Sequence, residues 1–496
     1  MSAVFAVDAC RTPIGKIKGA LADVRPDHLT ADVITALMMR NPWLDPQTVD
    51  DVYWGAANQA GEDNRNVARM GVLLAGLPVE VPGATVNRLC GSGMEAICSA
   101  ARAIAAGDAD ICVAGGTESM TRAPFVLPRA AEPFPRDAGV ADTRLGWRLV
   151  SPKMAEIYPP ISLGETAENV ADKYGVDRTR QDEFALRSHH LAAAARDGGQ
   201  FDREIIPVHT PHGAVTADEG VRADLTEAEL AAKRPAFRTG GTVTGGNSSP
   251  LNDGAAGLLL MSQRALTAVG ATPLARYAGG ASAGVHPDYM GIGPVPAMTK
   301  VLVRSGWRLE ELALVEVNEA FAAQAVAVID QLGLDPRLVN VNGGAIAIGH
   351  PLGCSGARIT TTLLYRRWFI EQRSRQTCRR MCVPLGWVVK NLERPDCQRT
   401  RPGQRWCSRS SCGRPAIESS LLSSRRPTAV LGRRSRNKPR AIIVAAADLL
   451  HLLPVWIAIF TAARKRRSRR FARASTRRSR RVHRGCTNSF GKLRRI

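Results

Sequence analysis

The chain of 496 residues is long enough for two or three domains, and its 45% hydrophobic content is ample for a buried core. Its net charge of +22 is divided unevenly. Residues 366–496 contain 35 of the 67 basic and 5 of the 45 acidic residues, whereas residues 1–365 carry a net charge of −8. An ordinary acidic body is therefore followed by a strongly basic segment, and the two need separate explanations.

The eleven cysteines argue against a disulfide-stabilised secreted protein. Five are scattered over the first 365 residues without framework spacing, and six crowd the last 131. The opening stretch "MSAVFAVDACRTPIGK" has no basic start, long apolar region or cleavage site. We therefore expect a reduced, cytoplasmic protein without a secretory signal.

Residues 1–120 alternate short apolar strands with amphipathic helices. The pattern predicts strands at 2–9, 51–57, 83–86 and 110–116, and helices at 28–40, 66–77 and 91–106. In the last helix the apolar residues recur at helical spacing, so that helix is expected to pack on a sheet. Alternation of this kind predicts a largely parallel sheet covered by helices.

The character changes between residues 121 and 248, where proline-rich loops precede a helix-rich stretch. This segment is expected to be a loop domain that forms a lid or pocket wall. Alternation returns over residues 249–365 and retraces the order of the first region. Both regions place a glycine-rich turn before an inner helix, "LCGSG" and "GCSG", which suggests an internal duplication.

Periodicity is lost after Tyr365, where arginine, serine and cysteine become frequent. The apolar run 441–463 is long enough to cross a bilayer. It contains Asp448, His451 and Pro454, which are costly there, so no membrane span is expected. We expect a solvated, disordered basic tail over 366–496, with non-specific nucleic-acid binding through its arginines as the lesser alternative.

Cys90 is the first candidate for chemistry, in "TVNRLCGSGMEA" between an extended segment and a predicted helix. A helix N-terminus lowers the pKa of a thiol, and Gly91 and Gly93 allow a ligand to approach the backbone closely. The alternative is a buried structural cysteine, which is the commoner situation for an isolated one.

Two further motifs contain polar residues suited to catalysis. His350 lies in the glycine-rich loop of "NGGAIAIGHPLGCSGAR", where it is either a general base or a hydrogen-bonded core histidine. Asn318, in "VNEAFAAQ", either holds a water, polarises a carbonyl or caps the following helix.

Together these stretches resemble the thiolase family over about residues 3–365. Supporting segments include "RTPIGK", "GGTESMTRAPF", "LGETAENVA", "GTVTGGNSSPLNDGAA" and "GIGPVPA". The stretch "QAGEDNRNVARM" is most similar to thiolases that cleave 3-oxoadipyl-CoA in aromatic degradation. The resemblance implies an α/β fold of two duplicated βαβαβαββ halves in five layers. The halves would be residues 1–120, completed by part of 249–270, and residues 249–365, with the loop domain 121–248 between them.

The resemblance also implies activity and residue roles. The enzyme would be an acyltransferase that cleaves 3-oxoacyl-CoA with CoA, or runs the reverse Claisen condensation, through an acyl-cysteine on Cys90. His350 would activate Cys90, and a water on Asn318 would help to stabilise the enolate. The positions matching the CoA site are Arg222, Phe237, Ser249 and Phe321. Coenzyme A would be a substrate, with no bound cofactor or metal, and the assembly a homodimer or homotetramer.

The sequence departs from the family pattern near its second cysteine motif, C-x-G-x-G. The nearest match is "MCVPLGWV", which makes Cys382 the candidate second catalytic cysteine. Pro384 replaces the motif's first glycine and has no N–H to donate to an oxyanion.

We hypothesise that a change of reading frame soon after Tyr365 produced the basic segment and left the second half without its last strands. Independent gene sequencing tests this. The alternative function is a catalytically impaired or inactive thiolase-fold protein whose basic tail binds nucleic acid or a membrane.

Overall fold

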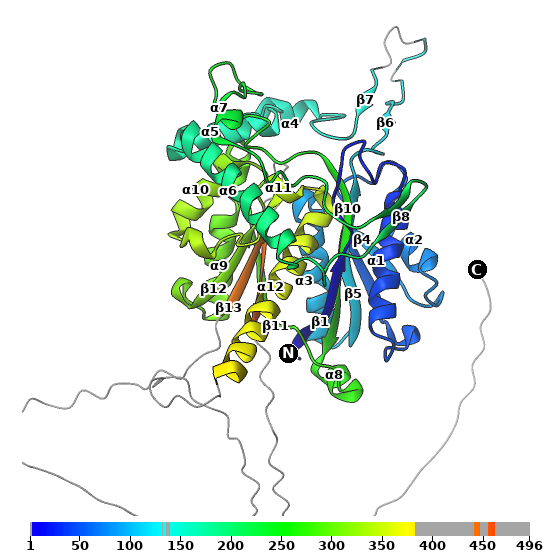
Figure 1. Cartoon of the computed structure of the whole chain (residues 1–496). Helices are drawn as coiled ribbons and strands as arrows, with labels where there is room; N and C mark the ends of the chain where they lie inside the picture. Colours follow the sequence, from blue (N-terminus) through cyan, green and yellow to red (C-terminus); the bar gives the residue numbers. More distant parts are fainter. Residues whose placement is uncertain (1, 131, 135–138, 382–440, 447–454, 462–496) are drawn as a thin grey trace, which may run out of the picture. The chain divides into compact units, whose positions relative to one another are not determined.

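The computed structural model describes residues 2–130, 132–134, 139–381, 441–446 and 455–461 (Figure 1). All of them belong to one compact unit, Met1–Ala462.

The first half of the fold is a mixed sheet. Its strands run side by side in the order β1 (Val4–Arg11), β10 (Asn252–Ser262), β5 (Ile111–Ser119), β3 (Asp51–Gly55) and β4 (Gly83–Val86). The ladders joining β5, β3 and β4 are parallel, whereas β10 is antiparallel to both of its neighbours. Every residue of β1, β5 and β10 is buried, as expected for strands covered on both faces.

The second half repeats this topology with different strands. Its order is β11 (Ala275–Ala283), β14 (Val455–Thr461), β13 (Ala441–Ala446) and β12 (Leu312–Val317). Strand β14 is antiparallel to both neighbours, as β10 is, and β13 is parallel to β12. Val339 bridges Val315 in parallel, at the place that β4 takes beside β3. This repetition confirms the predicted duplication, and a short β1–β11 ladder joins the halves.

Helices cover both halves in five layers (Figure 1). Helices α1 (Pro26–Arg40) and α2 (Val67–Leu74) pack on the outer face of the first half. Helices α9 (Pro294–Ser305) and α10 (Ala322–Leu332) share a hydrophobic core with the second half. Between the halves lie α3 (Ser92–Ala106) and α12 (Leu352–Met381), which contact strands of both.

The remaining elements are short strands and further helices. Strand β2 (Gly15–Lys16) pairs with β10. Helix α8 (Gln263–Val269) follows β10, and helix α11 (Ala345–Ile348) directly precedes α12. The long insertion contains β6 (Phe125–Val126), β7 (Ala141–Asp142), α4 (Pro152–Ile157), α5 (Leu163–Tyr174), α6 (Arg178–Asp197), β8 (Val208–Thr210), β9 (Gly213–Val215) and α7 (Glu227–Ala231).

The α3 helix forms where the sequence predicts it. Its interior is rich in alanine, a strong helix former, and its apolar face is buried. It ends at Gly107, whose φ of 95° suits glycine, and the Gly107 N–H caps the carbonyls of Ala103 and Ile104.

Glycines allow α3 and α12 to approach closely. A Cβ at Gly93 would lie 2.8 Å from both the amide nitrogen of Ala357 and the carbonyl oxygen of Gly353. A Cβ at Gly356 would clash with the backbone of Met94. The two inner helices therefore touch backbone to backbone beside their N-termini.

Two expectations about the sheet are corrected. The sheet is mixed rather than largely parallel, because β10 and β14 each run antiparallel to both neighbours. A short crossover helix between neighbouring strands would make them parallel. The chain between β5 and β10 is instead the long insertion, which allows β10 to run antiparallel to β5.

The second correction concerns the end of the chain. We expected the second half to lack its last strands, but β13 and β14 pair with β12 and β11. Their sequences, "AIIVAA" and "VWIAIFT", are rich in β-branched and aromatic residues, which favour strands. The domain boundaries themselves remain a prediction. Among the described helices, none combines the length and the hydropathy needed to cross a membrane.

Candidate active site

Cys90 is held in a strained turn directly before α3. It is buried in the short 3-10 turn Leu89–Gly91, and Leu89 has a φ of 49°, a left-handed conformation unfavourable for a side chain with a Cβ. The Ser92 hydroxyl accepts the Arg88 N–H at 2.8 Å and donates to the Leu89 carbonyl at 2.6 Å. These bonds hold the sulfur at the N-terminal end of the helix.

His350 takes the equivalent place in the second half, at the start of α12. Its backbone N–H donates to Asn252 Oδ1 at 2.9 Å. Gly349, with a φ of 122°, lets the loop pass against Asn252, because a Cβ there would lie 2.7 Å from that side chain. The imidazole is therefore fixed from β10, a strand of the first half.

The duplication brings the two side chains together. The distance between Cys90 Sγ and His350 Nε2 is 3.2 Å, a hydrogen bond between buried groups. On the other side of the ring, His350 Nδ1 lies 2.6 Å from Ser355 Oγ, whose own hydrogen is directed to the Pro351 carbonyl. Ser355 consequently accepts the Nδ1 hydrogen, which leaves the Nε2 lone pair facing the thiol.

The surroundings keep this imidazole neutral. Burial, with a smaller contribution from the positive charge of Arg358, lowers the pKa of His350 from 6.5 to about 3. A neutral imidazole with a lone pair aimed at a thiol can accept its proton, as a general base must.

Asn318 completes the cluster at the end of β12. Its Nδ2 lies 3.3 Å from His350 Nε2, while its buried Oδ1 accepts no hydrogen bond from any residue that the structure describes. The neighbouring Glu319 holds this loop through Ser188, Asn340 and the Ile346 N–H. The open Oδ1 is what a site for an ordered water requires.

Glu118 ties the two halves together beneath the site. Its carboxylate accepts the backbone N–H groups of Ala57 and Asn58 from the first half and of Gly353 from α12, at 2.9–3.1 Å. Burial raises the pKa of Glu118 to about 7, although the three N–H donors favour its charged form. This carboxyl fixes the start of α12 relative to the end of β3.

Three of the four predicted CoA-site residues lie with His350 around one cleft, the His350 cleft. Ser249 Oγ donates to the Ala320 carbonyl at 3.0 Å, and the Phe237 and Phe321 rings meet edge to face with centroids 6.0 Å apart. Arg222 is not among the residues lining this cleft; its backbone N–H donates to His189 Nδ1. The lining residues are Met120, Leu145, Gly146, Ser162, Leu163, Gly164, Phe237, Ser248, Ser249, Pro250, Leu251, Ala320, Phe321, His350 and Leu352.

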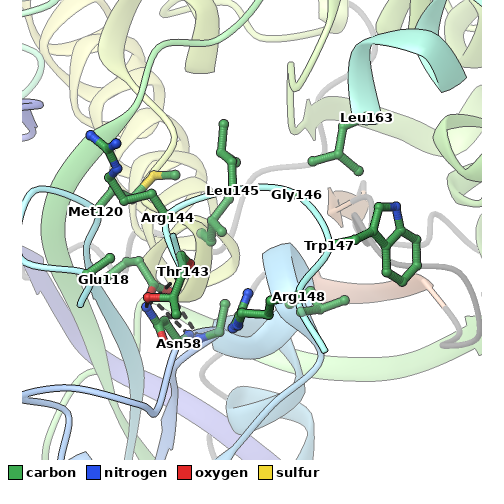
Figure 2. A pocket seen from close by; sticks show the side chains of 14 residues that line it. Asn58, Glu118, Met120, Thr143, Arg144, Leu145, Gly146, Trp147, Arg148 and Leu163 are labelled. Carbon is green, nitrogen blue, oxygen red and sulfur yellow. Dashed lines mark hydrogen bonds between the residues drawn. The ribbon is translucent and has the colours of Figure 1, made fainter. Parts of the chain in front are cut away.

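A second pocket, the Arg148 pocket, shares five lining residues with this cleft and therefore adjoins it. Figure 2 shows the side chains that line the Arg148 pocket. It lies beside the reactive pair, because Leu89 and Leu352 line it. The lining residues are Ala57, Asn58, Leu89, Glu118, Met120, Ala123, Thr143, Arg144, Leu145, Gly146, Trp147, Arg148, Leu163 and Leu352.

Two residues of this site were not predicted from the sequence, and one predicted residue lies outside the part of the chain that the structure describes. Cys382 lies outside the described residues. Ser355 and Glu118 were not predicted, although Glu118 has a sequence signal, since it is an acidic residue near the end of a fully buried strand. In the described ranges, no group of three or more His, Cys, Asp or Glu residues is arranged to hold a metal ion.

Comparison with known proteins decides the family. Residues 4–264 match the model of the thiolase N-terminal domain, and residues 271–389 match that of the thiolase C-terminal domain. The chain belongs to the thiolase family. This thiolase is 50% identical over 405 residues to the 3-oxoadipyl-CoA/3-oxo-5,6-dehydrosuberyl-CoA thiolase of Escherichia coli K12, with 79% of the chain and all of the relative covered. It is also 50% identical to a beta-ketoadipyl-CoA thiolase of Pseudomonas putida, covering 78% of the chain and 98% of the relative.

Solved structures give the same result for the fold of this thiolase. An acetyl-CoA acetyltransferase of Bacillus anthracis is 35% identical with a TM-score of 0.73, covering 92% of this chain and 99% of the other. Human mitochondrial 3-ketoacyl-CoA thiolase in complex with CoA is 31% identical with a TM-score of 0.74, covering 93% and 98%. The predicted thiolase fold and acyltransferase class are confirmed, and the non-catalytic alternative is not favoured.

Proposed function

We propose that this thiolase cleaves 3-oxoacyl-CoA substrates whose acyl chain ends in a carboxylate, with 3-oxoadipyl-CoA as the representative. The high identity to relatives named for 3-oxoadipyl-CoA supports the substrate class. The observation that carries the chemistry is the 3.2 Å contact between Cys90 Sγ and His350 Nε2.

The first half of the proposed reaction forms an acyl-enzyme. His350 Nε2 takes the thiol proton of Cys90, and the sulfur attacks the 3-oxo carbonyl carbon. The bond between C2 and C3 then breaks, and its electron pair becomes the enolate of acetyl-CoA. The protonated His350 and a water on Asn318 Oδ1 stabilise the enolate oxygen. A proton delivered to C2 releases acetyl-CoA; the donor implied by the family resemblance is Cys382.

The second half of the proposed reaction transfers the acyl group to CoA. The Cys382 thiolate left by the first half takes the proton of the CoA thiol, and the CoA sulfur attacks the thioester on Cys90 and releases the shortened acyl-CoA. The protonated His350 returns its proton to the Cys90 sulfur, so the enzyme returns to its starting state. The His350 cleft, with Ser249, Phe237 and Phe321 on its wall, is the proposed path for the pantetheine arm. We keep Arg222 as a proposed contact of the more distant nucleotide.

The test is CoA-dependent loss of the enolate absorbance of 3-oxoadipyl-CoA, compared between the wild-type chain and Cys90→Ala. We expect loss only with the wild type. A wild-type protein that is folded and cleaves neither 3-oxoadipyl-CoA nor acetoacetyl-CoA would contradict the proposal.

We further propose a cytoplasmic homodimer or homotetramer that uses coenzyme A as substrate and needs no bound cofactor. The mass of the purified protein by light scattering tests the assembly, and a monomeric mass would contradict it. Dialysis against a chelator before the assay tests whether a bound metal ion is needed. We expect the activity to be unchanged.

A further inference from the structure

The Arg148 pocket has apolar walls and a charged end. Leu89, Met120, Leu145, Leu163 and Leu352 supply the apolar surface. Asn58, Glu118, Thr143, Arg144 and Arg148 supply the polar groups. Figure 2 shows the Arg148 side chain directed toward the end where Asn58 lies, whereas the Trp147 ring points away. Such a pocket suits a short hydrocarbon chain that ends in a polar group.

The other charged groups of this pocket already have partners. Arg144 is paired with Asp142, with Nε 2.7 Å from Oδ2. The Glu118 carboxylate accepts three backbone N–H groups. Neither group therefore needs a ligand to satisfy it.

Arg148 differs from both. It is half-buried, and its guanidinium makes no hydrogen bond or ion pair with any residue in the described part of the chain. Its positive charge acts on the Glu118 carboxylate, but no hydrogen bond or ion pair joins these two side chains in the described structure. Withdrawing a cation partly from water without a hydrogen-bonded counter-ion costs free energy. A carboxylate ligand that accepts two hydrogen bonds from the guanidinium offsets this desolvation penalty.

The place of Arg148 relative to the reactive pair gives its role. Leu89, next to Cys90 in sequence, and Leu352, two residues after His350, line the same pocket. An acyl chain attached at Cys90 and directed away from the His350 cleft enters this pocket, with its far end toward Arg148. We propose that Arg148 is a specificity-determining residue that binds the terminal carboxylate of a dicarboxylic 3-oxoacyl-CoA; this inference rests on the proposed function.

The test compares two substrates of equal length, 3-oxoadipyl-CoA and 3-oxohexanoyl-CoA, which differ by a terminal carboxylate in place of a methyl group. The quantity measured is the ratio of their kcat/KM values. We expect Arg148→Gln to lower the preference for 3-oxoadipyl-CoA by about tenfold or more, chiefly through KM, because the variant loses the charge-assisted hydrogen bonds to the carboxylate. Arg148→Lys keeps the positive charge but lacks the two-pronged guanidinium, so its preference for 3-oxoadipyl-CoA should lie between those of the wild type and Arg148→Gln.

The matched control is Arg144→Gln, which removes a positive charge from the same pocket. Because Arg144 is engaged by Asp142, the preference should persist in this variant. An equal loss of preference in both variants, or no loss in Arg148→Gln, would overturn the assignment.

Binding to Cys90→Ala separates this inference from the proposed function. By calorimetry, 3-oxoadipyl-CoA should bind more tightly than 3-oxohexanoyl-CoA, and Arg148→Gln in the same background should abolish the difference. Equal binding of the two ligands contradicts the role of Arg148, even if the wild type cleaves both. A preference in binding without any cleavage by the wild type contradicts the proposed function and leaves the carboxylate site supported.

Discussion

Cys90 and His350 occupy equivalent positions in the two halves of the fold, and their reactive atoms lie 3.2 Å apart. Each side chain precedes an inner helix, α3 or α12, and those helices touch at glycines. The helix–helix contact therefore brings the nucleophile and the base together, and the hydrogen bonds of Ser92 and Asn252 hold each of them in place.

Cys90 is expected to carry the acyl group. After exposure to 3-oxoadipyl-CoA without free CoA, mass spectrometry of the intact and digested protein should show one succinyl group at Cys90. Cys98→Ala is the control, because Cys98 is a buried thiol of α3 whose pKa is raised to about 12 by burial, which leaves it unreactive. A folded protein with no adduct at Cys90, or with one at Cys98, would contradict the mechanism.

Ser355 is expected to act as a positioning residue for His350. Ser355→Ala removes the acceptor of the Nδ1 hydrogen. A buried unsatisfied donor costs about 1–3 kcal/mol, which corresponds to about 5–150-fold in kcat, with little change in KM. Thr360→Ala is the matched control, since it removes a buried hydroxyl of the same helix that bonds to Gly356 and not to the imidazole. If both variants lower kcat equally, the hydroxyl of Ser355 has no specific role.

The neutral state of His350 predicts a pH effect on stability. Its pKa is lowered by burial from 6.5 to about 3, so below pH 6.5 the unfolded chain binds a proton that the folded chain refuses. The free energy of unfolding should therefore fall as pH drops from 6.5 toward 3, by at most about 1.4 kcal/mol per pH unit from this group.

His350→Gln lacks this titration, so its stability should fall less steeply than that of the wild type over the same range. Urea unfolding at neutral and mildly acidic pH, at one protein concentration, measures both slopes. Parallel slopes would show that the imidazole titrates normally in the folded protein.

The glycine contact between α3 and α12 predicts a sharp steric effect. In Gly356→Ala the added methyl meets the backbone of Met94, and overpacking of this kind costs about 1–3 kcal/mol. The melting temperature should fall, and activity should fall further, because separating the helices lengthens the contact between Cys90 and His350. Gly284→Ala is the control, since Gly284 is exposed and its methyl would meet no atom within 4 Å. A melting temperature for Gly356→Ala equal to that of this control would disprove the close approach.

Much of the fold and the reactive pair could be predicted from the sequence. The α3 helix was expected from Gly91 and begins at Ser92, and Cys90, His350 and Asn318 were chosen from motifs that the fold brings together. Local patterns suffice here because each residue sits at a junction between a strand and a helix, where glycines and apolar periodicity mark the boundary.

The rest depends on contacts between distant segments. Strand direction in a sheet is set by the partner, so the pattern of β10 could not show that it runs antiparallel to β1 and β5. The same holds for 441–446 and 455–461, which contribute strands although they lie in the basic segment. The role of Ser355 follows from its hydrogen bond to His350. The role of Arg148 follows from the absence of any hydrogen bond between its guanidinium and the described residues. Spacing along the chain reveals neither feature.

The repeated topology has a consequence for how such a centre can arise. Two identical copies of one half, meeting through the same helix pair, would place the same side chain on both sides of their symmetry axis, two thiols or two imidazoles. Joining the halves in one polypeptide breaks that symmetry, so each side can change independently. Divergence between the two halves, here joined in one polypeptide, is thus what permits sulfur on one side and nitrogen on the other.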